Sequence, residues 1–186
     1  MAGLVIAISA PFLGAWADTS GRKMPWIYGF TTLAVVMASM LWILMPDGGG
    51  LIFALAAFWI GFVASESAFN LNNALLPSLG TPQQIGRISG TATAFGYWGG
   101  VASLFFAEND SGKTLIGLAP AFGLDPEWRE GTRFTGPFIA LWFGLFMIPY
   151  FIWNREPRVP KNPDATVGRM LKDLKASIVN ISRRRS

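Results

Sequence analysis

Five apolar segments follow one another along this chain, separated by polar breaks that are rich in Gly and Pro. About 20 apolar residues suffice to cross the hydrocarbon core of a bilayer. Because backbone amides in lipid must be hydrogen-bonded within their own segment, we expect the segments to be helices and the breaks to lie at the membrane surfaces. The sequence therefore predicts an all-α, polytopic transmembrane bundle over residues 1–153, with spans at about 1–17, 26–45, 51–76, 88–107 and 134–153.

The first segment also permits a second interpretation. Ala15-Trp16-Ala17 follows an apolar stretch and is similar to a signal-peptide cleavage site. However, no basic residue precedes the stretch, and Pro11 lies inside it. A truncated membrane span fits these features better than a signal peptide does.

The side chains available exclude several kinds of chemistry. Charged residues make up 14% of the chain, against about a quarter in a soluble domain. Cys and His are absent, so disulfides, thiolate metal sites and the commonest metal ligand are excluded. No nucleophile–base pair, metal cluster or cofactor motif is present. We therefore expect no enzyme, no catalytic residue, no metal and no cofactor, and the short run Arg183–Arg185 does not indicate nucleic-acid binding.

The distribution of positive charge predicts the orientation. Twelve of the fifteen Lys and Arg residues lie on one side of the expected spans: nine after Trp153, and Arg22, Lys23 and Arg87. The other three are Lys113, Arg129 and Arg133. Because the cytoplasmic side carries the excess of Lys and Arg, we expect an integral protein of the bacterial inner (plasma) membrane whose C-terminus is cytoplasmic.

The tail, residues 154–186, has a different pattern. From Asp164 onward, apolar residues recur at helical spacing with Lys and Arg between them. This predicts a basic amphipathic helix on the cytoplasmic side. It fits either an anionic membrane surface or packing against another cytoplasmic part of a protein.

The break after the first segment resembles the signature loop of the major facilitator superfamily, which joins the second and third membrane helices of those transporters. The residues that carry the resemblance are Gly14, Asp18, Gly21, Arg22 and Lys23. It implies that Asp18 helps to latch two halves of a transporter together. Thr19 stands where the family commonly has a basic residue, and a plain positively charged cytoplasmic loop is the simpler alternative.

This resemblance implies that the five segments are helices two to six, without helix one and without the C-terminal half. Two further stretches, Asn73–Pro77 and Gly96–Gly100, resemble the vacuolar effluxer (autophagy-related) branch of the superfamily. That branch implies export of small solutes such as amino acids.

Glu66 is the only carboxylate inside any expected span. An ionisable side chain at membrane depth usually faces a cavity or a partner. Asn70 and Asn73 follow at i+4 and i+7, so the three side chains share one helix face. We expect this face to form a substrate or proton site, although hydrogen bonding between helices would also account for it.

The fourth segment contains glycines at small-xxx-small spacing, which permits close helix packing. We assign this packing role to Gly90, Gly96 and Gly100. Gly96–Gly100 is not a phosphate-binding loop, because no strand precedes it and no Lys follows it.

These features favour a fragment of a secondary active transporter that moves small solutes by alternating access. Its expected partners are the lipid bilayer, the missing helix one and C-terminal half, and a small-molecule solute. We expect this chain alone not to transport. The alternative is a non-transport membrane scaffold or assembly factor.

Overall fold

The computed structural model describes residues 3, 6, 12–14, 17, 21–78, 80–119, 121–154 and 156. From Gly21 onward, the described residues form four long helices and three short 3₁₀ turns, in the order α2 (Met24–Met40), η1 (Leu41–Ile43), α3 (Leu51–Asn73), η2 (Leu76–Ser78), α4 (Pro82–Ser103), η3 (Ala121–Gly123) and α5 (Glu130–Trp153). Extended pairing within the described residues is limited to one antiparallel bridge, between Glu108 and Thr114. The prediction of an all-α protein is confirmed for this part of the chain.

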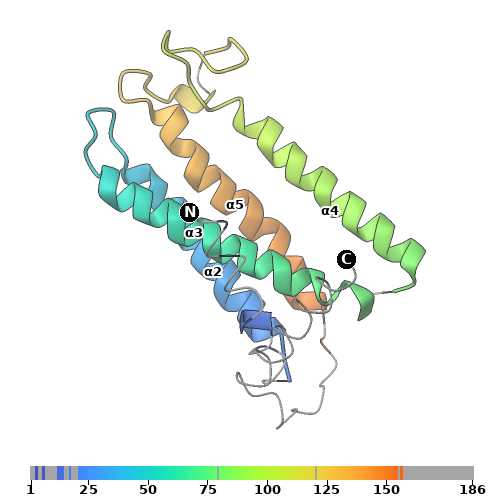
Figure 1. The fold of residues 1–186 in the computed structure, drawn as a ribbon. Coiled ribbons are helices and arrows are strands. Elements are labelled where there is room, and N and C mark those ends of the chain that lie inside the picture. The colour runs from blue at the N-terminus through green and yellow to red at the C-terminus, as the bar shows by residue number, and fades with distance from the viewer. Residues whose placement is uncertain are drawn as a thin grey trace, which may run out of the picture.

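The long helices form one elongated bundle. In Figure 1, α2, α3 and α5 lie together and α4 lies to one side of them, with the connections that follow η1 and α4 at the same end of the bundle. This end, which the distribution of positive charge predicts to face outward, is called the outer end below. Most of the first expected span and the tail from residue 157 lie outside the described residues.

Three described segments are long and apolar enough to cross a membrane: Met24–Ile43, Leu51–Ser78 and Glu130–Trp153. They correspond to the second, third and fifth expected spans. The fourth expected span, 88–107, lies mostly within α4, which does not belong to this group. The Gly, Ser, Thr and Gln residues of α4 lower its mean hydropathy. The described residues thus support three of the five spans.

Local capping explains where α4 begins. We expected this span to start near residue 88, where the apolar run starts, but the helix begins at Pro82. Thr81 is its N-cap, and the Thr81 N–H donates to the Gln84 side chain at 2.8 Å as half of a capping box. Pro82 occupies the first helical turn, where its missing N–H costs nothing. The cap therefore sets the helix start, and hydropathy does not.

Small residues line the contact between α2 and α3. The buried face of α3 contains Ala54, Ala57, Ala64 and Ala68. A Cβ added to Gly61 would come within 3.0 Å of the Met37 Cβ on α2. Alternate steps of three and four residues place these positions on one side of the helix. Close backbone approach through small residues is how helices associate in lipid, where the hydrophobic effect does not drive them together.

A similar contact joins α5 to α2. Gly136 is buried, and a Cβ added there would lie 2.6 Å from the Ala38 carbonyl oxygen. Towards the outer end, Arg133 donates from Nε and Nη2 to the Trp42 carbonyl oxygen at 3.1 and 2.8 Å, and its guanidinium lies 4.6 Å from the centre of the Trp42 ring. Arg133 therefore places a positive charge at the C-terminal end of the α2–η1 segment, where the helix dipole favours it.

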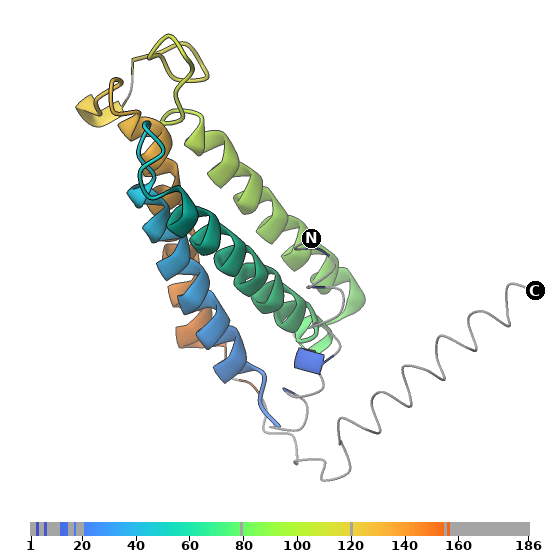
Figure 2. The same cartoon turned by 60° about the vertical axis from the view of Figure 1, so that its left-hand side comes forward.

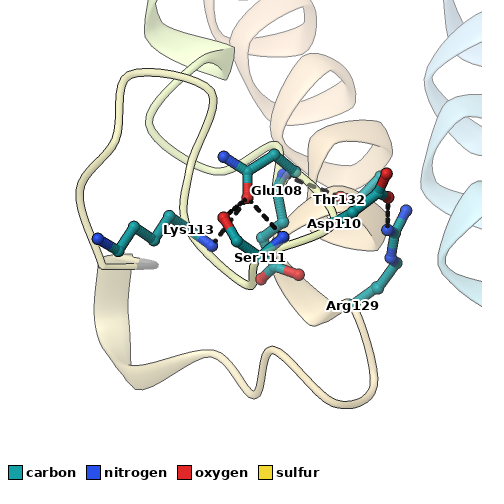
Figure 3. Close-up of polar contacts among 7 residues, drawn as sticks. Glu108, Asp110, Ser111, Lys113, Arg129 and Thr132 are labelled. Atoms are coloured by element: carbon teal, nitrogen blue, oxygen red, sulfur yellow. Dashed lines mark hydrogen bonds and ion pairs between the residues drawn. The ribbon is translucent and has the colours of Figure 1, made fainter.

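The connection between α4 and α5 folds back onto the start of α5. Glu108 is buried; its backbone N–H donates to Thr132 Oγ1, and its carboxylate accepts the Gly131 N–H, both at 3.0 Å. Around it, the Asn109 side chain accepts hydrogen bonds from the residues of a tight turn, and Arg129 pairs with Asp110 (Figure 3). These contacts fix the outer end of α4 against α5.

Candidate functional site

Glu66 lies in the inner half of α3, on the side opposite the alanine seam. At about 100° per residue, Ala64, Ala68 and Leu71 fall on the buried side of the helix, and Glu66 falls across from them. The Glu66 side chain is half-buried. Within the described part of the chain, no side chain forms a hydrogen bond or an ion pair with it. An ionisable group in an apolar span thus points away from the packing that holds the span in place.

Asn70 and Asn73 continue this face towards the inner end of α3, and both are exposed. Towards the outer end, the same face carries Ile52 and Leu55, which are also exposed. One side of α3 therefore changes from apolar to polar along its length. Because α3 is a continuous helix from Leu51 to Asn73, its apolar and polar parts lie along the same side of the helix.

A small cavity of about 90 Å³ lies beside this polar stretch. Asn70 contributes to its lining, and so do Gly14 and Lys23 from the predicted latch loop. The other lining residues are Leu13, Ser67, Leu71 and Ala74. Two groups of residues that the sequence singled out separately, the loop and the α3 face, therefore meet at one place.

The remaining latch residues divide between described and undescribed positions. Gly21 has φ +68°, the left-handed conformation that favours glycine in a tight turn, and it is buried. Arg22 is exposed at the start of α2. Asp18, the residue expected to latch the two halves, lies outside the described residues.

Two contacts near this loop were not foreseen from the sequence. The Glu156 carboxylate accepts the backbone N–H groups of Lys23 and Met24, at distances from 2.7 to 2.9 Å. Tyr150 on α5 donates its hydroxyl to the Asn72 side-chain oxygen on α3 at 2.5 Å. The sequence contains one indication of the first contact. No Ser, Thr, Asp or Asn occupies the N-cap of α2, so its first N–H groups need an acceptor from elsewhere in the chain.

The close approach of α4 to α5 is made by a glycine that we did not select. A Cβ on Gly99 would lie 2.7 Å from Trp142 Nε1, whereas at Gly90, Gly96 and Gly100 it would meet nothing within 4 Å. Among the described residues, therefore, Gly99 has the packing role that we assigned to the other three. A packing role for those three requires a partner beyond the described residues.

No group of three or more His, Cys, Asp or Glu side chains among the described residues could hold a metal ion. Comparison of the chain with family models, with curated proteins and with solved structures gave no match.

Proposed function

We propose that this chain is part of a secondary active transporter of the major facilitator type, and that the inner half of the α3 face is part of its solute path. The observation that carries the proposal is Glu66: a half-buried carboxylate in an apolar span, turned away from the helix-packing seam. An unpaired charge facing lipid is costly. A side chain so placed is best accounted for by an aqueous path or by a partner that binds there.

The residue types on this face suit a small zwitterionic or polyol solute. Glu66 would bind an amine or exchange a proton, and the amides of Asn70 and Asn73 would bind a carboxylate or hydroxyl groups. Small solutes such as amino acids are therefore the proposed substrate class. Transport would occur by alternating access of two halves in the bacterial inner membrane, with helix one and the C-terminal half supplying the rest of the path.

The cavity beside Asn70 supports a mechanical link between the solute face and the latch loop. Gly14 and Lys23 line the same small space as Asn70. A displacement of the loop would therefore change the surroundings of this amide directly. We propose that this contact couples the state of the cytoplasmic latch to the α3 face.

The test is a flux assay in membrane vesicles that contain the whole open reading frame to which this sequence belongs. Radiolabelled amino acids and polyols serve as probes, and Glu66→Gln is compared with Asp47→Asn, a change at an exposed carboxylate in the turn before α3. We expect Glu66→Gln to lower the flux of a transported solute by about tenfold or more, which corresponds to about 1.4 kcal/mol. The Asp47 variant should transport normally, because its amide oxygen can still accept the Gly49 N–H.

Equal flux in both variants would show that Glu66 does not contribute to the solute path. Absence of flux for every probe with the unaltered protein would favour the non-transport scaffold. Vesicles that contain only these 186 residues should show no flux.

A further inference from the structure

The connection between α4 and α5 exposes large apolar side chains although it lies outside the helical spans. Five side chains between residues 115 and 128 are concerned: Leu115, Ile116, Leu118, Phe122 and Trp128. We call the described residues of this stretch, 115–119 and 121–128, the apolar lobe. Large apolar side chains that gather, exposed, in one loop commonly mark an interaction site.

Phe122 is the most exposed large apolar residue of the described chain, at 86%. Its φ is +61°, a conformation that bulky residues rarely adopt. One face of its ring stacks on Phe106, with the ring centres 6.0 Å apart. The remaining surface of the ring points outward from a strained turn. Strained conformations persist where the surroundings hold them, and they are frequent at binding surfaces.

The preceding part of the connection has the opposite character. Residues 107–114, the polar lobe, hold the Glu108–Thr132 contact, the tight turn at Asn109 and the Asp110–Arg129 pair (Figure 3). Ser111 and Lys113 are exposed there. One connection thus contains a hydrogen-bonded polar half and an apolar half.

The apolar lobe directly precedes a helix that is able to span a membrane. It ends one residue before α5, which begins at Glu130 and is one of the three helices able to span a bilayer. In Figure 2, η3, which belongs to the lobe, projects sideways from the outer end of α5. This part of the lobe therefore sits beside the bundle, where lipid headgroups would surround α5.

We propose that the apolar lobe is an interfacial anchor, and that Leu118 and the rings of Phe122 and Trp128 insert among the headgroups and upper acyl chains of the outer leaflet. Trp and other aromatic side chains favour this depth. Asp125 and Glu127, within the same lobe, limit the insertion to the headgroup region, because charge is costly deeper in the bilayer.

Lipid is the favoured occupant because the lobe continues an apolar surface that already requires it. Ile139 and Leu141 in the middle of α5 are exposed, and so is Phe105 just beyond the end of α4. These side chains would otherwise face water. The lobe therefore extends the lipid-facing surface of the bundle.

The absence of cysteine permits a direct test with single-cysteine variants. Leu118→Cys and Phe122→Cys are compared with Ser111→Cys and Lys113→Cys in the polar lobe. Each is labelled with the fluorophore NBD and reconstituted into vesicles of phosphatidylcholine and phosphatidylglycerol. Quenching is then measured with nitroxide-labelled lipid and, separately, with aqueous iodide.

We expect lipid nitroxide to quench the labels at 118 and 122 several-fold more than those at 111 and 113, and iodide to show the reverse order. Two variants in the apolar lobe are used because Phe122→Cys alters the strained turn, whereas Leu118→Cys lies outside it. Iodide quenching at 118 and 122 equal to that at 111 would overturn the anchor. Protection of 118 and 122 from both quenchers would also overturn it, and would indicate that protein covers the lobe.

Discussion

The carboxylate of Glu156 closes the N-terminus of α2 across a sequence separation of 133 residues. It accepts the Lys23 N–H at 2.7 and 2.8 Å and the Met24 N–H at 2.9 Å. The N-cap of α2 has no side-chain hydrogen bond of its own, and Pro25 has no N–H to satisfy. An acid at a helix N-terminus is stabilised by the helix dipole. The residue just beyond α5 thus fixes the start of α2.

The first prediction concerns this cap. Glu156→Ala should destabilise the protein by about 1–2 kcal/mol, because it removes both a capping acceptor and a favourable charge. Glu156→Gln should cost less, since its amide oxygen can still accept an N–H. Thermal unfolding in detergent micelles measures both, with Glu127→Ala as the exposed control. A Glu156→Ala midpoint equal to that of the control would contradict the role of the cap.

Arg133 forms the matching contact at the other end of the α2–η1 segment. Replacing it with Met keeps most of the apolar stem but removes two hydrogen bonds to the Trp42 carbonyl and the cation–π contact. Hydrogen bonds to charged groups contribute about 1.5–3 kcal/mol. We expect Arg133→Met to lower the unfolding midpoint clearly and Arg133→Lys to lower it less. Lys113→Met, at an exposed position in the outer connection, should have little effect.

Gly→Ala substitutions distinguish helix faces that pack closely against a neighbouring helix from faces with open space beside them. Gly136→Ala should destabilise the bundle, because the new Cβ would lie 2.6 Å from the Ala38 carbonyl and 2.7 Å from the Leu41 Cβ. Gly96→Ala has open space among the described residues and should gain about 0.5–1 kcal/mol of helix propensity. Unfolding midpoints of the two variants should therefore shift in opposite directions. A loss of stability at Gly96→Ala would show that a segment beyond the described residues packs there.

The lengths of the apolar runs predicted the positions of the helices well, but they predicted the helix ends less accurately. The expected span 51–76 and helix α3 both begin at Leu51, where Gly50 adopts a φ of +76° close to the Ile43 carbonyl. For α4 the prediction was six residues late, because a polar capping box and Pro82 precede the apolar residues. Local hydrogen bonds decide such ends, and hydropathy does not report them.

Contacts that depend on how helices rotate about their axes were less predictable. Spacing alone offered several glycines on α4, and the position of Trp142 on α5 decided that Gly99 is the one in contact. The contacts of Glu156 with Lys23 and of Arg133 with Trp42 join residues far apart in sequence. By contrast, the shared face of Glu66, Asn70 and Asn73 follows from helical geometry within one segment and needed no tertiary information.

The last prediction tests orientation. The excess of Lys and Arg predicts that the α4–α5 connection lies outside and the N-terminus of α4 in the cytoplasm. Ser111→Cys and Gln83→Cys introduce single thiols at two exposed positions of a chain that has none of its own. In intact cells, a membrane-impermeant maleimide should label the cysteine at 111, and the cysteine at 83 should react only after permeabilisation. The two variants differ only in the position of the thiol. The reverse labelling pattern would show that the topology is opposite to the predicted one. Labelling of both cysteines in intact cells would show that α4 does not separate two compartments.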